Sequence, residues 1–349
     1  MESASATRIP SLDGVRAIAV LLVIGGHLGR NWGSVVFLPI FGVHVFFVLS
    51  GYLITTLLQQ EREGRGRIDL IGFYLRRCFR IFPAAFAFMA VIALIEPATR
   101  SALLYAATYT VSYHLSSTPL IFWHLWSLSV EEQFYLIWPL ALLLAYQRRV
   151  WVAWLAMIAA AGFRLAMVLN GSTHDFAFVH YSFPGTMDSI AAGCLLAIYY
   201  PQIRQRWKWM TESAAVAIAI PVTAWILATT CFGDSRIKLV RDVGSTMWGL
   251  VPLLIALSLF VLIERADKIL NNPVAATIGV LSYSLYLWQQ PFTVSDQHSA
   301  WQAVLMLTGC AVASYRLVEK PMLKLGALLK GRRTLRVPLG SELPSPVRE

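Results

Sequence analysis

Three ionisable residues lie near the start of the chain in an otherwise apolar stretch, and the histidine among them has a side chain suited to acid–base chemistry. Arg16 and His27 are eleven positions apart, which on a helix is about three turns plus about 20°, so both lie on one face. Along the helix axis they are about 16 Å apart. Asp13 lies one turn before Arg16 and is placed to pair with it. The stripe suits a wet catalytic cavity, but it also fits a structural ion pair beside a separate interfacial histidine.

A pair of arginines three positions apart is the second candidate. Arg77 and Arg80 belong to an inner-loop run that leads into the third apolar segment. Residues at i and i+3 face the same side of a helix, and guanidinium groups match phosphate oxygens well. The pair therefore suits a phosphate-bearing cytosolic ligand. By spacing alone, ordinary basic flanking of a membrane span is the favoured explanation of the pair.

A third group combines hydroxyl, carboxylate and aromatic side chains. Residues 124–135 include His124, Trp126, Ser127, Glu131 and Tyr135. Such a cluster can bind a polyhydroxylated substrate. The alternative is an aromatic belt at the membrane surface, with Ser127 and Glu131 near capping geometry at a helix start.

The composition indicates that a membrane surrounds these residues. Of the 349 residues, 57% are hydrophobic and 14% are charged, whereas soluble domains have about 45–50% and about 25%. Each span needs roughly 20 apolar residues, so spans and connectors together leave room for roughly ten helices. A large soluble domain does not fit beside them.

Apolar runs of spanning length predict where these helices lie. The candidate spans are residues 11–29, 36–58, 81–97, 126–147, 151–169, 184–200, 213–231, 244–263, 278–295 and 300–318. We therefore expect an all-α integral membrane protein with about ten transmembrane helices and both termini in the cytoplasm.

Three segments need separate treatment. The first run contains Asp13 and Arg16 and no small-residue cleavage site follows it, so we expect a retained helix and not a signal peptide. Residues 102–122 are interrupted by polar side chains and are expected to be interfacial or re-entrant. The membrane domain is then 11–321, between a cytoplasmic segment 1–10 and a basic cytoplasmic tail 322–349 with a disordered end.

The basic residues support this topology. The formal net charge is +10, and with ten spans and a cytoplasmic N-terminus most of the Lys and Arg residues fall in inner segments, as the positive-inside rule requires. Counting 102–122 as a span would move Arg148 and Arg149 to the outer side. The membrane topology therefore explains the net positive charge, and a nucleic-acid partner is not needed to explain it.

The cysteines give no sign of a disulfide framework or a zinc site. Cys78, Cys194, Cys231 and Cys310 are far apart and form no C-x-x-C pair. We expect no metal site.

Taken in order, the motifs resemble those of the bacterial membrane acyltransferase-3 family, whose members O-acylate surface polysaccharides, lipid-linked glycans or macrolides. They are Leu12–Val20 followed by His27, Val45–Thr55, Arg77-x-x-Arg80, Trp126–Tyr135, Tyr283–Trp288, and Ser314 to Glu319-Lys320-Pro321. The resemblance covers nearly the whole chain.

Two positions depart from the family pattern. His44 stands where many members have an acidic residue, and Gln289 stands where a histidine commonly follows Leu-Trp. The second departure removes a titratable group. Some relatives continue into an extracytoplasmic hydrolase-like domain, and we expect this chain to work as a membrane core alone.

The resemblance implies an acyl-CoA donor, which is a substrate and not a permanently bound cofactor. It implies His27 as the general base and Arg77 and Arg80 as ligands of the donor's phosphates. Arg16 would steer the pantetheine arm or stabilise oxyanion charge, and Glu131 would orient the acceptor or the histidine. Trp126, Ser127 and Tyr135 would bind the acceptor.

The function implied is O-acyl transfer in the bacterial inner membrane. An acyl group, most simply acetyl, would move from acyl-CoA to a hydroxyl of a cell-surface or lipid-linked carbohydrate, such as lipopolysaccharide or an exopolysaccharide. The alternatives are acylation of a macrolide or other small metabolite, a proton-coupled transporter, since buried Asp, Arg and His also build proton pathways, and a non-catalytic scaffold that binds glycan.

Overall fold

The computed structural model describes residues 10–29, 38–170, 176–206, 250–265, 270–294 and 299–334. All regular secondary structure in these ranges is helical. Within them, five helical segments are long and apolar enough to cross a membrane: Ser11–Leu28, Leu38–Arg65, Leu70–Ile95, Leu120–Leu169 and Ala300–Leu329. The all-α class is therefore confirmed for the described residues, and the five candidate spans are consistent with a membrane protein. The number of ten helices and the placement of the termini stay predictions, and the candidate span 213–231 lies outside the described residues.

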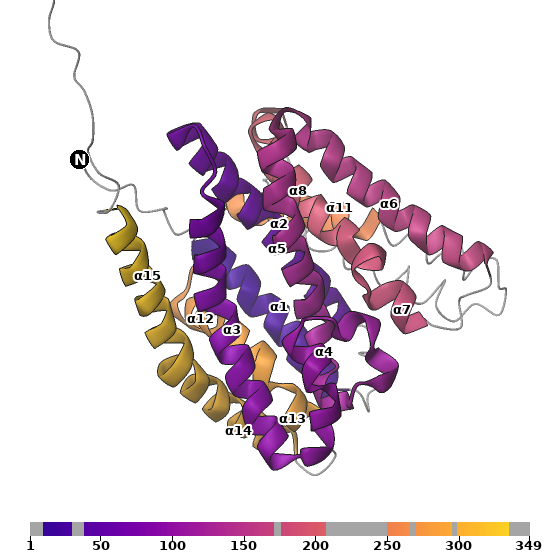
Figure 1. The fold of residues 1–349 in the computed structure, drawn as a ribbon, viewed down its shortest axis with the longest axis vertical. Coiled ribbons are helices and arrows are strands. Elements are labelled where there is room, and N and C mark those ends of the chain that lie inside the picture. Colours follow the sequence, from indigo (N-terminus) through magenta and orange to yellow (C-terminus); the bar gives the residue numbers. More distant parts are fainter. Residues whose placement is uncertain are drawn as a thin grey trace, which may run out of the picture.

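Figure 1 shows the helices of the described residues, coloured in chain order. The first part comprises α1 (Pro10–Leu28), α2 (Leu38–Arg65), α3 (Leu70–Ile95), η2 (Pro97–Ala102), α4 (Leu103–Ala107), η3 (Val111–Tyr113), η4 (Leu115–Ser117), η5 (Leu120–Phe122), α5 (Leu125–Ala145), η6 (Tyr146–Arg148) and α6 (Arg149–Leu169). The second part comprises α7 (Phe176–Tyr181), α8 (Phe183–Arg206), α11 (Leu250–Arg265), α12 (Pro273–Trp288), α13 (Gln290–Thr293), α14 (Ala300–Ser314), η9 (Tyr315–Glu319) and α15 (Lys320–Thr334).

Helix α3 begins earlier than its apolar run predicts. Asp69 caps the helix by accepting a hydrogen bond from the backbone N–H of Gly72 at 2.9 Å. The helix therefore includes the basic segment before the apolar run, and Arg77 and Arg80 lie on α3 and not in an inner loop. A hydropathy window detects only the apolar part of a helix, which explains the difference.

Close backbone contact between α2 and α8 depends on glycine. A Cβ atom at Gly51 would overlap the carbonyl oxygen of Ile190, and one at Gly193 would overlap the carbonyl oxygen of Val48. Small residues at such contacts let helix backbones approach in membranes. Helix α1, which carries Arg16 and His27, packs against both α2 and α12.

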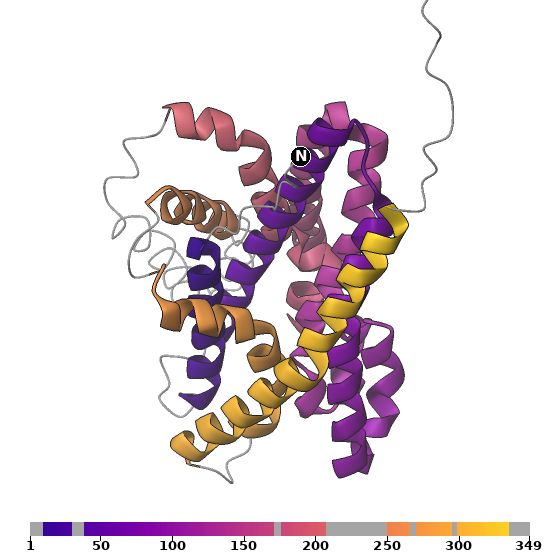
Figure 2. The same ribbon diagram turned by 90° about the vertical axis from the view of Figure 1, so that its left-hand side faces the viewer.

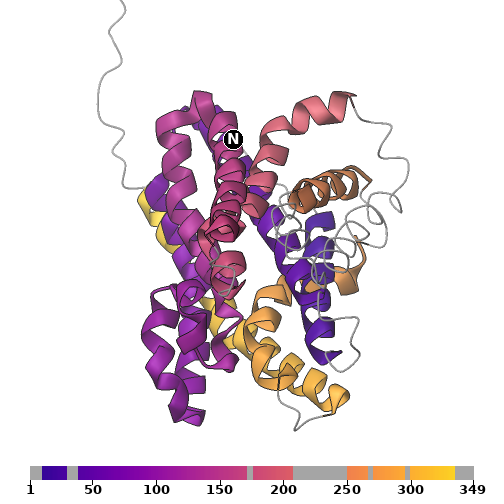
Figure 3. The same cartoon turned by 90° about the vertical axis from the view of Figure 1, so that its right-hand side faces the viewer.

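The segment predicted to be interfacial or re-entrant forms short helical turns and no spanning helix. It lies against α3 and α5 (Figure 3). Tyr109, with a left-handed φ of 54°, stacks on Phe82 of α3 at 5.4 Å between ring centroids. Phe82 is about 20 Å along the axis from the end of α3 at Ile95, so the segment returns well into the bundle. Residues 102–122 therefore contain no long helix, and their interfacial or re-entrant position stays a prediction.

The C-terminal helices form one long rod beside α3. Helices α14 and α15 are joined by the π-helical turn η9 (Figure 2), and α15 packs against α3. The beginning of the tail predicted at 322–349 is thus helical, and residues from 335 on lie outside the described part of the chain. π-Helical turns in other proteins are frequent at functional sites.

Candidate active site

Helix α1 places its ionisable residues as its period predicts. Arg16 Nη1 lies 3.3 Å from Asp13 Oδ1, so the predicted pair forms. The His27 ring donates through Nδ1 to the carbonyl of Val23 at 2.8 Å, which in the neutral ring makes Nε2 the basic nitrogen. His27 is half-buried and lies within electrostatic range of the buried His124, the residue before α5.

Three arginines from two helices converge. Arg16 of α1 and Arg77 and Arg80 of α3 lie within electrostatic range of one another. Arg80 is exposed and the other two are half-buried, although side chains of further helices, Tyr135 and Glu319, are also in range of Arg80. The arginines are thus enclosed by helices and still accessible. Charged groups at such depth are unfavourable unless they are paired or wetted.

Arg77 and Arg80 of α3, unlike Arg76, are not held by a close carboxylate among the described residues. Among the described residues, neither Arg77 nor Arg80 forms an ion pair within 4.0 Å. The guanidinium carbon of Arg77 instead lies 4.4 Å from the centroid of the Tyr135 ring and 5.9 Å from that of Phe73. Their N–H groups are therefore available to an anionic ligand.

Glu131 and Tyr135 lie next to these arginines, at the contact between α5 and α2. Ser50 Oγ donates to Glu131 Oε1 at 2.7 Å, and the Tyr135 hydroxyl donates to Glu131 Oε2 at 3.2 Å. The two hydroxyl oxygens are 3.3 Å apart. Arg77 and Arg16 are within electrostatic range of the carboxylate. Glu131 is therefore a fixed carboxylate beside the arginine group.

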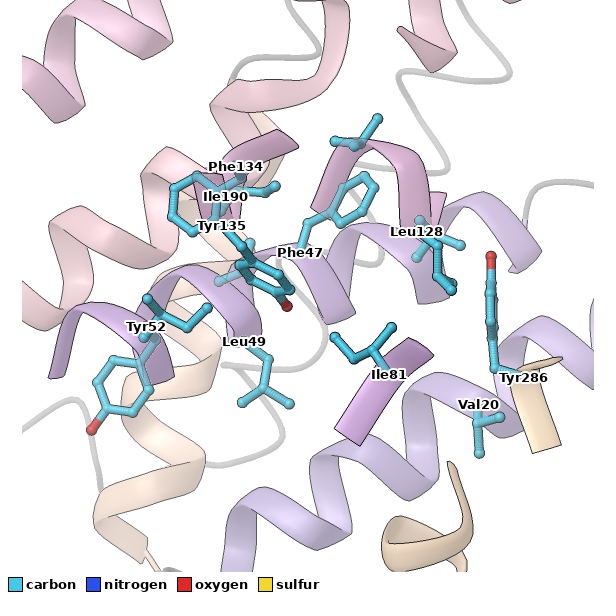
Figure 4. Close-up of a cluster of buried hydrophobic side chains, with 14 of the residues drawn as sticks. Val20, Phe47, Leu49, Tyr52, Ile81, Leu128, Phe134, Tyr135, Ile190 and Tyr286 are labelled. Atoms are coloured by element: carbon cyan, nitrogen blue, oxygen red, sulfur yellow. The ribbon is translucent and has the colours of Figure 1, made fainter. Parts of the chain in front are cut away.

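Ser127 belongs to a different polar group, nearer His27. Its Oγ is 2.6 Å from the Tyr286 hydroxyl, which is 3.0 Å from the carbonyl oxygen of His124. The His124 ring lies edge to face with Tyr286 at 5.8 Å. Figure 4 shows Tyr286 and Tyr135 among buried apolar side chains such as Leu128. Hydroxyl groups from α5 and α12 thus meet near the two histidines.

Trp126 is part of the packed core. Its ring contacts Phe47 at 5.8 Å and Tyr181 at 4.7 Å between centroids, and 8% of the residue is exposed. It is not part of an aromatic belt at the surface. The capping interpretation of Ser127 and Glu131 is also wrong, because α5 begins at Leu125 and Glu131 bonds to Ser50 of α2.

Ser50, Tyr286 and Glu319 are polar residues of the arrangement that residue spacing alone did not single out. Glu319 is buried and accepts a hydrogen bond from Ser284 Oγ, and it lies within electrostatic range of Arg80. All three residues lie in the motifs that carry the family resemblance. Those motifs were the available signal, but the partners come from distant helices and their pairing is not readable from spacing.

The two departures from the family pattern lie outside these groups. His44 Nδ1 is 2.6 Å from Ser189 Oγ, near the buried ion pair of Arg164 and Asp188 at 2.7 Å. The side-chain amide of Gln289 donates to Gln290 Oε1 at 3.0 Å and its oxygen accepts from Thr293 at 3.1 Å. Gln289 therefore braces the turn between α12 and α13.

No metal centre is evident in the part of the chain that the structure describes, where no three His, Cys, Asp or Glu side chains converge. Cys78, Cys194 and Cys310 are free thiols. Cys231 lies outside the described residues.

Comparison with known protein families shows which family this chain belongs to. The model of the acyltransferase domain known as Acyl_transf_3 matches residues 9–313. The chain belongs to this family. The ordered motifs thus identified the family correctly, and membership agrees with a multi-pass membrane protein.

Curated relatives of the family are O-acetyltransferases by name. The chain is 29% identical to the peptidoglycan O-acetyltransferase OatA of Listeria monocytogenes over 91% of this chain and 56% of that protein. It is 31% identical to the O-acetyltransferase OatA of Staphylococcus aureus over 91% of this chain and 58% of that protein. The chain thus spans less than two thirds of the length of these relatives. No solved structure matches it.

Proposed function

We propose that this protein is a membrane O-acetyltransferase that moves an acetyl group from acetyl-CoA to a hydroxyl of a cell-surface carbohydrate. Family membership supports acyl transfer. The names of the relatives support acetyl as the group and a cell-wall glycan as the type of acceptor. The bacterial inner membrane is the site that fits a cytosolic donor and a surface acceptor.

The observation that carries the proposal is the convergence of Arg16, Arg77 and Arg80. Three accessible guanidinium groups, two of them without a close carboxylate, suit a ligand with several phosphates. CoA carries a diphosphate and a further phosphate at one end and the thioester at the other. The phosphates would bind to α3, whose Arg77 and Arg80 have accessible guanidinium groups.

The distance between the arginines and His27 matches the shape of this donor. Arg16 and His27 are about 16 Å apart along α1, so one group cannot bind the phosphates and also act at the thioester. The pantetheine arm, a long chain that ends in the sulfur, would bridge this distance. Arg16 then steers the arm, and His27 meets the acyl carbon.

His27 would supply the base that the reaction needs. As the acceptor hydroxyl attacks the thioester carbonyl, Nε2 takes its proton, and the hydrogen bond from Nδ1 to Val23 holds the ring in the required tautomer. The hydroxyls of Ser127 and Tyr286 and the nearby His124 would form the acceptor side. As the C–S bond of the thioester breaks, the imidazolium would return this proton to the sulfur, and CoA would leave as the thiol.

Two measurements on the full chain test this function. In nanodiscs, saturating acetyl-CoA should raise the melting temperature, because a ligand that binds only the folded state stabilises it. In cells, surface glycans should carry an added acetyl mass only when the gene is present. If acetyl-CoA does not raise the melting temperature and deletion of the gene leaves the glycans unchanged, the proposed function is ruled out. Transport or scaffolding would then remain as the function.

A further inference from the structure

Tyr135 links the proposed donor site to an anchored hydrogen-bond group. Its ring, 3% exposed, is the surface on which the guanidinium of Arg77 lies, at 4.4 Å from the centroid. The hydroxyl at the far end of the ring reaches Glu131 Oε2 at 3.2 Å. One side chain therefore contacts both the cation and the carboxylate.

The position of the ring is fixed from several directions. Ser50 of α2 donates to the other oxygen of Glu131 at 2.7 Å, and its own oxygen is 3.3 Å from the Tyr135 hydroxyl. Phe134 lies against the ring at 5.9 Å between centroids. The hydrogen bonds fix the hydroxyl end of the side chain and Phe134 restrains the ring, so the face offered to Arg77 is held in place.

A fixed aromatic face matters for an arginine that binds phosphate. A free arginine side chain has many rotamers, and ordering it upon binding weakens affinity. An aromatic face attracts the guanidinium, most strongly where water is scarce, and leaves its N–H edges open. Arg77, without a close carboxylate among the described residues, has this arrangement.

We propose that Tyr135 is a positioning residue that holds Arg77 ready for the phosphates of the donor, and that Ser50 and Glu131 hold the Tyr135 ring. The inference rests on the proposed function, because it needs a phosphate-bearing donor. It places Tyr135 and Glu131 on the donor side of the site, whereas the sequence had suggested acceptor binding for Tyr135 and a role at the reacting groups for Glu131.

The test compares two donors that share a thioester and differ in phosphates. Acetyl-CoA carries the phosphates, and S-acetylpantetheine lacks them. The measured quantity is the ratio of kcat/KM for the first donor to that for the second, in reconstituted membranes. A residue that only supports the fold would lower both values and leave their ratio unchanged.

Tyr135→Leu removes the ring, and Tyr135→Phe is the matched control that keeps it. We expect Tyr135→Leu to lower the ratio about 5- to 30-fold, the range expected for losing a cation–π contact, and Tyr135→Phe to keep most of it. Arg77→Ala should lower the ratio as well. Adding Tyr135→Leu to Arg77→Ala should produce no further drop, because the ring acts through the arginine.

Two results would overturn the proposal: an unchanged donor ratio in Tyr135→Leu, or a full additional drop in the double variant. If Tyr135→Leu does not reach the membrane, Ser50→Ala replaces it. This variant removes one anchoring hydroxyl and should lower the ratio by less, and an unchanged ratio counts against the proposal. If the wild type does not use acetyl-CoA as a donor, the proposed function fails independently of this proposal. The same variants then test the role of Tyr135 through the ratio of their affinity for CoA to their affinity for pantetheine.

Discussion

Arg77 and Arg80 lie one turn apart on α3, but their neighbours differ. Arg77 rests on Tyr135, and Arg80 lies near Glu319, whose carboxylate is bonded to Ser284. Of the carboxylates within electrostatic range of these two arginines, Glu131 and Glu319 accept hydrogen bonds from hydroxyl groups, and Glu132 forms no ion pair with Arg77 within 4.0 Å. Among the described residues, no close carboxylate therefore competes with an incoming phosphate for the guanidinium N–H groups.

Loss of these arginines should weaken donor binding. Each charge-assisted hydrogen bond contributes about 1.5–3 kcal/mol, so the Arg77→Ala, Arg80→Ala double variant should raise the Kd for CoA at least about tenfold. Isothermal titration of the protein in nanodiscs measures this. Arg67→Ala, an exposed basic residue just after α2, is the control and should bind normally. Unchanged CoA affinity in the double variant would mean that both arginines only anchor the topology.

The hydroxyl of Tyr286 should matter to the other substrate. Tyr286→Phe removes the group that contacts Ser127 and the carbonyl of His124. A single hydrogen bond contributes about 1 kcal/mol, so the KM for the acceptor should rise about fivefold while that for acetyl-CoA stays unchanged. Steady-state kinetics with each substrate varied separates these effects. A selective rise in the KM for acetyl-CoA would place Tyr286 on the donor side.

At the scale of helices, the contact of α2 with α8 determines where Ser50 is held. Gly193→Ala would place a Cβ against the carbonyl oxygen of Val48, and such overpacking costs about 1–3 kcal/mol. The melting temperature should fall. Gly162→Ala in α6 is the matched control, since a Cβ there meets nothing within 4 Å. Equal stability of both variants would show that α2 and α8 are not in backbone contact.

The sequence predicts the apolar parts of the helices better than their ends. The run 184–200 lies within α8 and 151–169 within α6, because a spanning helix must be apolar over a minimum length. The start of α3 at Leu70 depends on a cap at Asp69, which a hydropathy average does not detect. Helix α5 begins at Leu125 without a side-chain capping hydrogen bond, so the local capping pattern was misleading.

For the site too, the sequence predicts features within one helix but not contacts between distant segments of the chain. The shared face of Arg16 and His27, and that of Arg77 and Arg80, follow from the helical period. The bond from Ser50 to Glu131 joins residues 81 positions apart, and that from Ser127 to Tyr286 joins residues 159 positions apart. Such pairs depend on how helices pack, which single-sequence spacing does not contain. The roles of the site residues stay predictions.

For the whole molecule, the arrangement predicts which surfaces face each side of the membrane. By the positive-inside rule, most basic residues are predicted to lie on the cytoplasmic side, where the donor's phosphates would enter. If residues 97–124 form a re-entrant segment, both ends of the segment lie on the outer side of the membrane. Its contacts with α3 and α5 are consistent with this path.

Cysteine labelling tests this topology. In a background without the native cysteines, Ser101→Cys and Ser117→Cys, both exposed, should react with a membrane-impermeant maleimide from outside. Arg67→Cys should react only after the membrane is opened, because it lies on the basic, cytoplasmic side. Labelling of Ser101→Cys and Ser117→Cys from opposite sides would show that the segment crosses the membrane.

The most direct measurement of the central claim is transfer of labelled acetyl from acetyl-CoA by the reconstituted protein with His27 replaced by alanine. The claim is that phosphates bind at the arginines of α3 while the thioester reaches His27. It predicts that His27→Ala binds CoA with the affinity of the wild type and transfers no acetyl group to the glycan. Retained transfer in a correctly inserted His27→Ala protein would contradict it.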